Sequence, residues 1–234
     1  NHWYMTPQYK NRESYYGMPR HNLAAVNVAA DDYVAGPLED WCPSALHFDG
    51  VSKYAWTRGY ISDFVNLDIS TNNFLIEAYL RTVVDHTGGV ICAKADTQGY
   101  SLSIDDYGRP VFQILRDGAV VYTRVGAVHV NDGVWLHLLV QVERQPGPGV
   151  SIFVDGFRTQ TYSSDIVPDW SVALTNAAVF YVGRGPGGNY FAGDIDFLRV
   201  ARDTLQSAKT TIDELYDWQF NGPFLRDFRG VMAY

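Results

Sequence analysis

The stretch Asn131-Asp-Gly-Val-Trp-Leu-His-Leu-Leu-Val-Gln-Val-Glu143, followed by Val150-Ser-Ile-Phe-Val-Asp-Gly156, indicates the fold class. By the two-residue period of a strand, four apolar residues of the first segment share one face: Leu136, Leu138, Val140 and Val142. Trp135 and Leu139 make the opposite face largely apolar too, so we expect a strand in the middle of a sheet, covered on both faces. Asp155-Gly156 supplies the positive-φ residues that a tight hairpin turn needs.

Further strands follow the same rules. Residues 100–105 alternate apolar and polar side chains, as a half-buried strand does. Asp117-Gly118 joins residues 111–116 to residues 119–123 as a second hairpin. Residues 146–149 and 185–188 consist only of Gly and Pro and contain no strand-forming residue. They predict loops at the rim of the fold.

The order of these segments carries a family resemblance. Besides Trp135-Leu-His137 and Phe153-Val-Asp-Gly156, four segments contribute to it: Ala45–Gly50, Phe74–Tyr79, Tyr181–Arg184 and Phe191–Arg199. From about Ala45 to Leu205 the chain resembles the laminin-G-like, concanavalin-A-like jelly roll. The resemblance implies an all-β fold, a two-sheet antiparallel jelly-roll sandwich. Leu136 stands where many relatives carry a second histidine, so the resemblance implies no paired-histidine chemistry.

The composition limits the class of protein. A chain of 234 residues with 47% hydrophobic content can bury the core of a single β-sandwich. A net charge of −8 provides no basic stripe for phosphates, which argues against nucleic-acid binding. No apolar run approaches the length of a membrane span. The sequence opens without Met or a signal peptide, so we expect a mature form or a fragment. An extracellular location is implied by the resemblance alone.

The pattern divides the chain into three parts. Residues 1–43 form an arm without clear periodicity, within which Leu23–Ala29 could pair as a strand or pack along the sandwich. Residues 44–205 form the jelly roll, and residues 206–234 form a tail that packs on it. Within the tail, residues 211–220 predict a short helix, because Thr211 and Glu214 have capping-box spacing.

The two cysteines leave two alternatives open. A disulfide between Cys42 and Cys92 would tie the arm to the sandwich in an oxidising compartment. Alternatively, both are buried thiols that behave as small hydrophobic side chains. The spacing in the sequence does not decide between them.

Catalysis is not expected. Relatives that cleave β-glucans carry Glu-x-Asp-x-x-Glu or a near variant, and this sequence has no such motif. Asp194-Ile-Asp196 has the same-face spacing but no following glutamate. His137 lies within a strand predicted to be buried, which favours a hydrogen-bonded structural histidine over a catalytic one. The sequence also lacks a Gly-x-Ser-x-Gly elbow.

The resemblance implies a calcium site. Many sandwiches of this superfamily hold a structural calcium ion with an aspartate of the closing strand and carbonyl groups near the opening strand. In this chain the ligands would be Asp196 and groups near Asp49 and Gly50. The alternative is that Asp196 accepts backbone hydrogen bonds at the end of a strand.

A sugar-binding surface combines aromatic rings, which stack on pyranose faces, with polar side chains that bond hydroxyl groups. The rim residues that fit this description are Asp96, Gln98, Trp170, Arg184, Asn189 and Tyr190. Arg184 and Tyr190 flank the glycine-rich loop, which would let a ligand approach the backbone. For each of these residues, ordinary packing is the alternative.

These observations predict a non-catalytic, extracellular carbohydrate-binding or adhesion module whose partner is a glycan. The alternative is a structural subunit that assembles into a surface layer or filament as a homo-oligomer through its N-terminal arm. Five aromatic anchors of the arm support that alternative: Trp3, Tyr4, Tyr9, Tyr15 and Tyr16. A polysaccharide-active enzyme is the third possibility.

Overall fold

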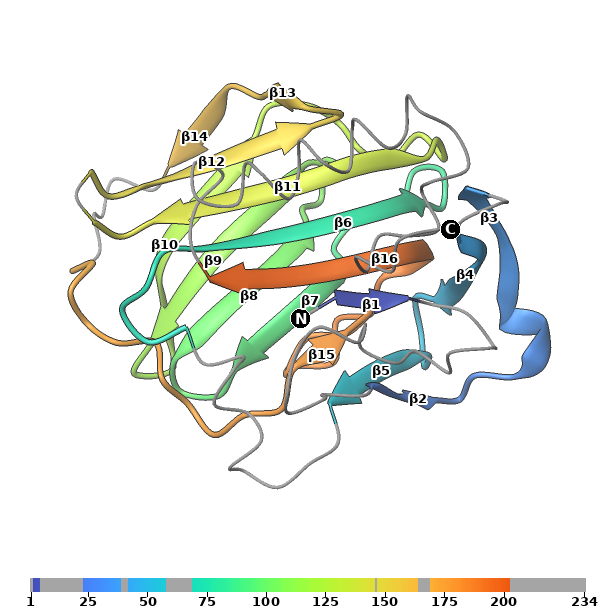
Figure 1. The fold of residues 1–234 in the computed structure, drawn as a ribbon, viewed down its shortest axis with the longest axis horizontal. Helices are drawn as coiled ribbons and strands as arrows, with labels where there is room; N and C mark the ends of the chain where they lie inside the picture. The colour runs from blue at the N-terminus through green and yellow to red at the C-terminus, as the bar shows by residue number, and fades with distance from the viewer. Residues whose placement is uncertain are drawn as a thin grey trace, which may run out of the picture.

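The computed structural model describes residues 2–4, 23–38, 42–57, 69–145, 147–163 and 169–202 (Figure 1). These residues form strands and one short turn of 3-10 helix, η1 (Ala30–Asp32). The strands are β1 (His2–Tyr4), β2 (Leu23–Val26), β3 (Tyr33–Leu38), β4 (Cys42–Asp49), β5 (Tyr54–Thr57), β6 (Phe74–Thr82), β7 (Val90–Ala95), β8 (Gly99–Ile104), β9 (Pro110–Arg116), β10 (Ala119–Gly126), β11 (Leu136–Glu143), β12 (Gly149–Val154), β13 (Phe157–Arg158), β14 (Thr161–Ser163), β15 (Tyr181–Val182) and β16 (Ala192–Arg202).

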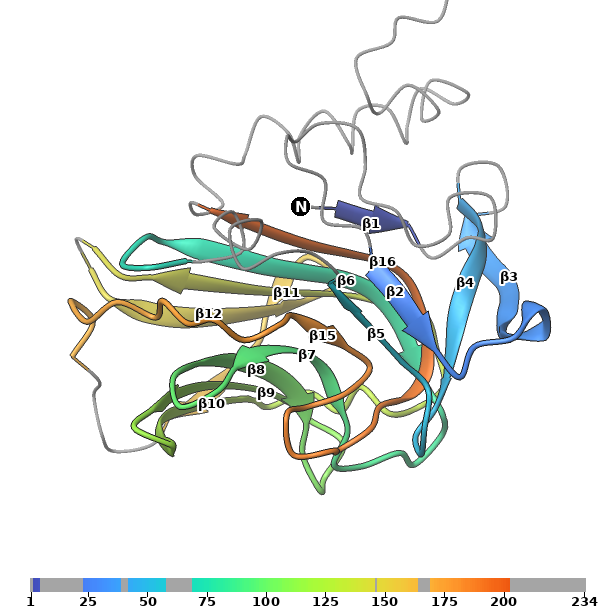
Figure 2. The same cartoon turned by 90° about the horizontal axis from the view of Figure 1, so that it is seen from below.

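The strands make two antiparallel sheets that stack as a sandwich (Figure 2). The front sheet, which faces the viewer in Figure 1, has the order β13-β12-β11-β6-β16-β4-β3, and β1 also pairs with β16. The back sheet has the order β14-β10-β9-β8-β7-β15-β5-β2. The predicted all-β sandwich is therefore confirmed.

Both predicted Asp-Gly turns are present. Asp155 and Gly156 have φ values of 50° and 79°, and they join β12 to β13. Asp117 and Gly118, with φ values of 50° and 76°, join β9 to β10. Paired positive φ angles match the right-handed twist of the flanking strands, which is why these dipeptides predict hairpins.

The core lies between the sheets and follows the alternation of β11. Its inward side chains are at most 5% exposed: Leu136, Leu138, Val140 and Val142. On the outer face of the same strand Leu139 is only 3% exposed, so β11 is covered on both sides as predicted. Phe74 of β6 bridges the layers, with ring centroids 5.1 Å from Tyr100 and 6.0 Å from Phe112 of the back sheet. Burying each such side chain stabilises the fold by about 1.5–3 kcal/mol.

The region before Ala45 contributes strands to both sheets. β2 pairs with β5 in the back sheet, and β3 pairs with β4 in the front sheet. The alternative in which residues 23–29 pair as a strand is therefore observed for β2, and the boundary placed at residue 43 falls within β4. The physical reason is that an edge strand satisfies its backbone by pairing on one side only, so it needs little periodicity of its own.

Two other expectations concern the ends of the chain and the thiols. The predicted helix at residues 211–220 lies outside the described residues and stays a prediction. Cys92 is a free, fully buried thiol in β7, and burial raises its pKa far above the usual value. It therefore behaves as the small hydrophobic side chain of the second alternative. No helix in the described ranges is long and apolar enough to span a membrane.

Candidate functional site

Three of the six rim residues predicted from the sequence lie together in the connection between β15 and β16. Arg184 and Tyr190 form an isolated backbone bridge, and Asn189 lies exposed beside them. The glycine-rich loop between them is closed by two hydrogen bonds, from Gly185 N–H to the Asn189 carbonyl and from Gly188 N–H to the Gly185 carbonyl, each 3.1 Å long. The loop thus presents Arg184, Asn189 and Tyr190 at one place on the surface.

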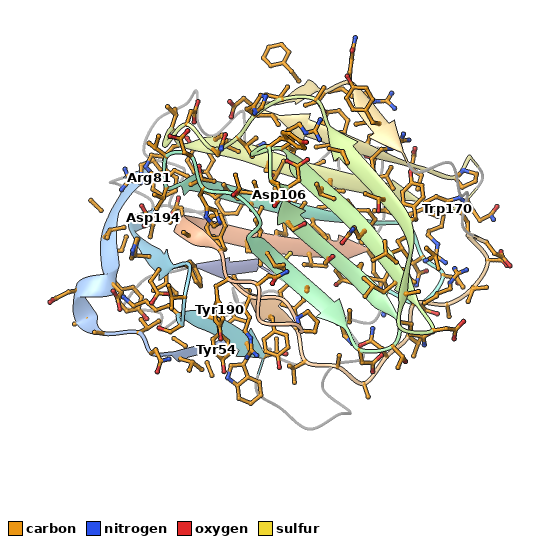
Figure 3. The ribbon with its side chains drawn as sticks, turned by 180° about the vertical axis from the view of Figure 1, so that it is seen from behind. Tyr54, Arg81, Asp106, Trp170, Tyr190 and Asp194 are labelled. Atoms are coloured by element: carbon orange, nitrogen blue, oxygen red, sulfur yellow. The ribbon has the colours of Figure 1, made fainter. Side chains whose placement is uncertain are left out.

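Three tyrosines surround Arg184. Its guanidinium carbon lies 4.9 Å from the ring centroid of Tyr54, 5.4 Å from that of Tyr181 and 5.5 Å from that of Tyr190. The Tyr54 ring also lies 6.0 Å from Tyr181 and 6.3 Å from Tyr190. Figure 3 shows Tyr54 and Tyr190 side by side. We call these four residues the rim cluster. All four side chains are half-buried.

The local sequence explains how the rim cluster forms. Tyr54 and Tyr181 point outward because the residues that follow them, Ala55 and Val182, point into the core. Gly183 has a φ of 76°, and a β-carbon there would collide with the Phe48 ring. Only glycine tolerates both conditions, and the resulting bend directs Arg184 away from the core.

The electrostatics of Arg184 differ from those of its counterparts. Arg109 is paired with the Asp105 carboxylate at 2.7 Å, and Arg81 with Asp194 at 2.5 Å. Among the described residues no carboxylate pairs with Arg184, and its buried Nε has no hydrogen-bond partner there. Three aromatic faces stabilise its charge instead. The half-buried side chains of Arg184 and the three tyrosines are therefore the groups that a ligand would contact at this surface.

The other three predicted rim residues lie elsewhere. Trp170 is 8% exposed and belongs to the core, where its ring packs edge-on against Tyr122 at 5.2 Å. The buried Arg144 donates two hydrogen bonds to the Trp170 carbonyl, which hold this segment against the sandwich. The expectation that Trp170 presents its ring at the rim is therefore wrong. Figure 3 shows it far from Tyr54.

Asp96 and Gln98 lie in the turn between β7 and β8. Asp96 accepts a hydrogen bond from Gln98 N–H at 3.1 Å, and the Gln98 side chain donates to the Thr175 carbonyl. Burial would raise the pKa of Asp96, but bonds from the N–H groups of residues 97 and 98 lower it below its usual value. Both side chains are thus committed to the turn and its neighbour, and the structure does not bring them to the rim cluster.

The residues proposed for calcium do not fit a shared site. Asp49 pairs with Ala192 of β16, so Asp196 lies four residues away, roughly 13 Å along the strand. Calcium ligands lie about 2.3–2.6 Å from the ion. Asp49 also accepts four hydrogen bonds, from the N–H groups of residues 51–53 and from the Ser52 hydroxyl. In the described ranges no group of three His, Cys, Asp or Glu residues could hold a metal ion.

Asp196 itself is the extra residue of a bulge in β16, where the register to β6 shifts between Ile195 and Phe197. Its side chain is fully buried. The structure thus places Asp196 apart from Asp49 with its carboxylate buried, and calcium binding stays a prediction.

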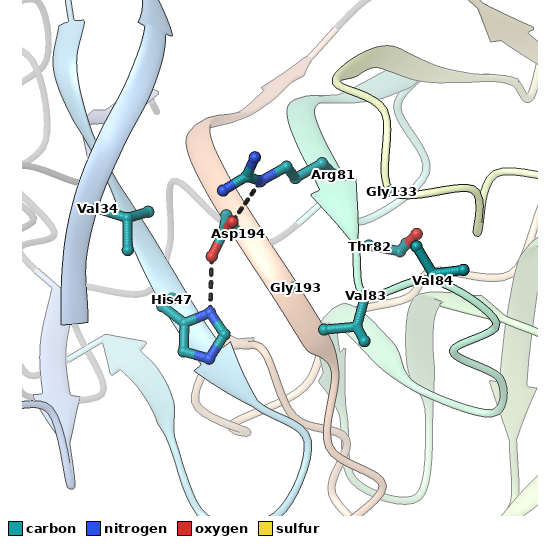
Figure 4. Close-up of a pocket in the computed structure, with 9 residues that line it drawn as sticks. All are labelled: Val34, His47, Arg81, Thr82, Val83, Val84, Gly133, Gly193 and Asp194. Atoms are coloured by element: carbon teal, nitrogen blue, oxygen red, sulfur yellow. Dashed lines mark hydrogen bonds and ion pairs between the residues drawn. The ribbon is translucent and has the colours of Figure 1, made fainter.

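A pocket of about 340 Å³ opens on the outer face of the front sheet, where β4, β16 and β6 adjoin. Its polar wall is a line of three side chains (Figure 4). Asp194 Oδ1 lies 2.7 Å from His47 Nδ1, and Asp194 Oδ2 lies 2.5 Å from Arg81 Nε. The rest of the lining is Val34, Thr82, Val83, Val84, Gly133 and Gly193. We call this the front-sheet pocket.

Sequence reasoning singled out Asp194 but missed His47 and Arg81. Strand alternation places each of the three on the outer face, opposite inward Leu46, Leu80 and Ile195. The signal that was missing is the strand order, because β16 lies between β4 and β6 and brings together residues that are distant in sequence.

The histidine of β11 has hydrogen-bond partners on two neighbouring segments. His137 Nε2 lies 2.6 Å from Glu77 Oε1, and the backbone N–H of His137 donates to the Asp155 carboxylate at 2.8 Å. The predicted hydrogen bonding of this histidine is therefore observed.

Comparisons with known proteins agree with this architecture. A family model described as the concanavalin A-like lectin/glucanases superfamily matches residues 57–209. Among curated proteins no match was found. A structure of botulinum neurotoxin type C has a TM-score of 0.58 and 12% identity over 85% of this chain and 46% of that one, so this chain spans less than half of its length. Domain 4 of AbnA, an arabinanase from Geobacillus stearothermophilus, has a TM-score of 0.53 and 15% identity over 78% and 82%. The chain belongs to the concanavalin A-like lectin/glucanase superfamily.

Proposed function

We propose that this chain is a non-catalytic, extracellular carbohydrate-binding or adhesion module and that the rim cluster is its glycan-binding surface. The observation that carries the proposal is the arrangement of Tyr54, Tyr181 and Tyr190 around Arg184. Tyrosine rings can stack on the apolar faces of sugar rings, and a guanidinium donates hydrogen bonds to their oxygens. The exposed Asn189 adds a side chain that both donates and accepts.

Proteins with a similar fold support the same class of ligand. The botulinum neurotoxin structure comes from work on the dependence of cell entry upon interaction with two ganglioside molecules. Domain 4 of the arabinanase AbnA was determined in complex with arabinotriose. At 12% and 15% identity these likenesses concern the fold, so they support a glycan ligand in general and no particular sugar.

The hydrogen bonds of Asp194 favour a non-catalytic role. Asp194 belongs to the segment Asp194-Ile-Asp196, whose spacing is the most similar to the β-glucanase motif. Both oxygens of Asp194 are already bonded, to His47 and to Arg81. A carboxylate held in this way is poorly placed to act as a nucleophile or a general acid. We expect no turnover of β-glucans, alginate or glycosaminoglycans in reducing-end and unsaturated-product assays. Turnover that Asp194→Ala abolishes would overturn the assignment.

The test of the proposed function is a glycan array probed with a multimerised form of the chain. Single-site affinity for a surface of this kind is about micromolar to millimolar, so multivalency is needed to observe it. We expect binding that falls in Tyr190→Ala and persists in Tyr107→Ala, which removes a tyrosine that is 69% exposed elsewhere. A blank array would count against glycan binding.

A further inference from the structure

We propose that the front-sheet pocket is a second ligand site, for an uncharged ligand that carries several hydroxyl groups, such as a terminal sugar residue. In this site His47 accepts a hydrogen bond from one hydroxyl group, and Arg81 donates to the oxygen of another. The pocket and the rim cluster share no residue, so this inference does not depend on the function proposed for the rim.

The arrangement around Asp194 determines which nitrogen of His47 carries the proton. The Asp194 side chain is 8% exposed and accepts a hydrogen bond from Arg81 Nε. A carboxylate beside a guanidinium acts as an acceptor, so the 2.7 Å contact with His47 requires Nδ1 to be the donor. We therefore assign the Nδ1–H tautomer to the neutral imidazole. Its other nitrogen, Nε2, then carries a lone pair and accepts hydrogen bonds.

The nitrogen atoms of His47 and Arg81 that do not bind Asp194 provide one acceptor, His47 Nε2, and the terminal donors of Arg81. The side chains of His47 and Arg81 are 36% and 39% exposed, and both line the pocket. Figure 4 shows His47 Nε2 pointing away from Asp194 and the terminal nitrogens of Arg81 on the side away from their own strand. No described residue bonds to either group. A ligand with several hydroxyl groups offers the complementary groups, an O–H donor for His47 and an oxygen acceptor for Arg81.

The charge of the pocket favours an uncharged ligand over an anion. Asp194 neutralises Arg81 directly, so the guanidinium keeps its donors while its charge is compensated. Asp85 and Asp132, in the loops next to the pocket, are exposed and add negative charge nearby. This negative charge repels a carboxylate ligand, whereas it has little effect on an uncharged ligand that carries hydroxyl groups.

The remaining walls suit a sugar ring. Val34, Val83 and Val84 are apolar, and a cavity of about 340 Å³ lies within the range of small-molecule sites. Glycine at position 193 is required, because its φ is 152° and a β-carbon there would collide with the Arg81 carbonyl. The close approach of β16 to β6 at this point places Asp194 against Arg81.

The polar groups are held before a ligand arrives. The Arg81 guanidinium lies 5.2 Å from the Trp135 ring centroid, so it is fixed between an aromatic face and Asp194. Trp135 in turn stacks on Tyr79, with ring centroids 5.7 Å apart and an interplanar angle of 14°. Side chains that are already ordered lose little entropy on binding, which raises the affinity for a small ligand.

The first experiment uses the unaltered chain. Nitrogen-15 correlation spectra recorded over a series of buffer pH values report which His47 nitrogen is protonated. We expect a protonated Nδ1, and a shift of the Nε2 resonance on titration with methyl glycosides of glucose, galactose and mannose. Among methyl glycosides of deoxy sugars that each lack one hydroxyl group, at least one should produce a weaker shift. A protonated Nε2, or no His47 response to any glycoside at high millimolar concentration, would overturn the proposal.

Variants assign the two roles. His47→Phe keeps a flat ring and removes the acceptor, and Arg81→Met keeps the stem and removes the donors; each should weaken binding about three- to tenfold. Arg184→Met, in the rim cluster, should leave glycoside binding at the pocket unchanged, which separates this site from the proposed glycan surface. A response to glucuronate alone, insensitive to His47→Phe, would replace the proposed site with an anion site.

Asp194→Asn tests the mechanism of the site rather than its shape. An asparagine of the same size can donate to Nδ1, which would move the imidazole proton to Nε2 and abolish the acceptor. We expect the spectra to report the changed tautomer together with lost glycoside binding. Unchanged glycoside binding with a proton on Nε2 would contradict the role assigned to His47.

Discussion

Glu77 binds His137 and Arg199 at the same time, at the centre of the front sheet. Its Oε1 lies 2.6 Å from His137 Nε2, and its Oε2 lies 2.7 Å from Arg199 Nε. The three residues belong to β6, β11 and β16, which are adjacent in the sheet. The side chains of Glu77 and Arg199 are 5% and 11% exposed, so this carboxylate compensates a charge that water hardly reaches.

Removal of Glu77 should therefore destabilise the fold strongly. Glu77→Ala leaves the Arg199 guanidinium buried without its carboxylate, which costs about 3–5 kcal/mol of unfolding free energy. Glu77→Gln keeps the size and one acceptor, so we expect an intermediate loss. Urea unfolding followed by tryptophan fluorescence measures both. Glu143→Ala, at the end of β11, is the matched control, and equal stability of the two alanine variants would contradict the assigned role.

A pH effect is expected at Asp49. Burial alone would raise its pKa, but hydrogen bonds from the N–H groups of residues 51–53 and the Ser52 hydroxyl outweigh burial and hold the pKa well below its usual range. The folded-state pKa is thus lower than the unfolded-state pKa. Its contribution to stability is fully present above the unfolded value, about 4, and is lost as the pH falls through the folded value.

The measurement compares Asp49→Ala with the unaltered chain. At neutral pH the variant should be less stable by about 1 kcal/mol or more, because the N–H groups of residues 51–53 lose their acceptor. The difference should shrink in urea titrations carried out at progressively lower pH below about 4. A difference that stays constant down to the acid transition would mean that the carboxylate charge contributes nothing there.

The sequence determined the fold through local rules. β11 was predictable because the two-residue period and the Asp155-Gly156 turn depend only on neighbouring residues. Arg184 and Tyr190 could be placed together because the same glycine-rich loop carries both. Trp170 could not be placed, since a tryptophan between polar loop residues looks exposed until Arg144, 26 positions away, is seen to hold its backbone.

Contacts between distant strands were beyond those rules. His47 and Asp194 are 147 positions apart, and Arg81 and Asp194 are 113 apart. Alternation predicts that each points outward, but only the order of β4, β16 and β6 makes them neighbours. The same holds for Tyr54, which reaches Arg184 because β5 pairs with β15. Pairing order is a property of the whole chain, and a single sequence does not state it.

The third prediction concerns the positive charge of Arg184 in the rim cluster. Arg184→Met removes the guanidinium and keeps the stem, and we expect glycan binding to weaken about tenfold, because a ligand loses its donors and the tyrosines lose the cation that positions them. The matched control is Arg109→Met. The Arg109 guanidinium lies 4.9 Å from the Tyr107 ring centroid but is already paired with Asp105. Titration of immobilised glycan measures both variants. Equal binding by both would reject the rim cluster and leave glycan binding open.

A calcium dependence can be tested at Asp196, although the structure does not bring Asp49 to it. If an ion binds only the folded state, the stability rises with its concentration relative to the dissociation constant. The melting temperature should then fall on addition of EDTA, recover with excess calcium, and show neither change in Asp196→Asn. Identical melting curves in EDTA and calcium would leave Asp196 as a structural carboxylate of the bulge.

The last prediction concerns the N-terminal arm. β1 pairs antiparallel with β16 of the same chain, in the register His2–Arg199, Trp3–Leu198 and Tyr4–Phe197. This strand extends the front sheet along the part of β16 that β4 does not cover. An intramolecular strand avoids the entropic cost of association, so we expect a monomer by size-exclusion chromatography with light scattering.

Deletion of residues 1–20 separates this arrangement from exchange between copies. If the arm completes its own sheet, the truncated chain stays monomeric, and its melting temperature falls by about 2–4 °C for each 1 kcal/mol of lost strand pairing. If a neighbour's arm occupies the same edge, the full chain forms oligomers in a head-to-tail manner that can close a ring or grow a filament. The deletion then abolishes assembly and leaves the melt of the isolated subunit unchanged. Assembly of the full chain that the deletion abolishes would therefore show that β1 exchanges between copies, even though its register on β16 remains the same.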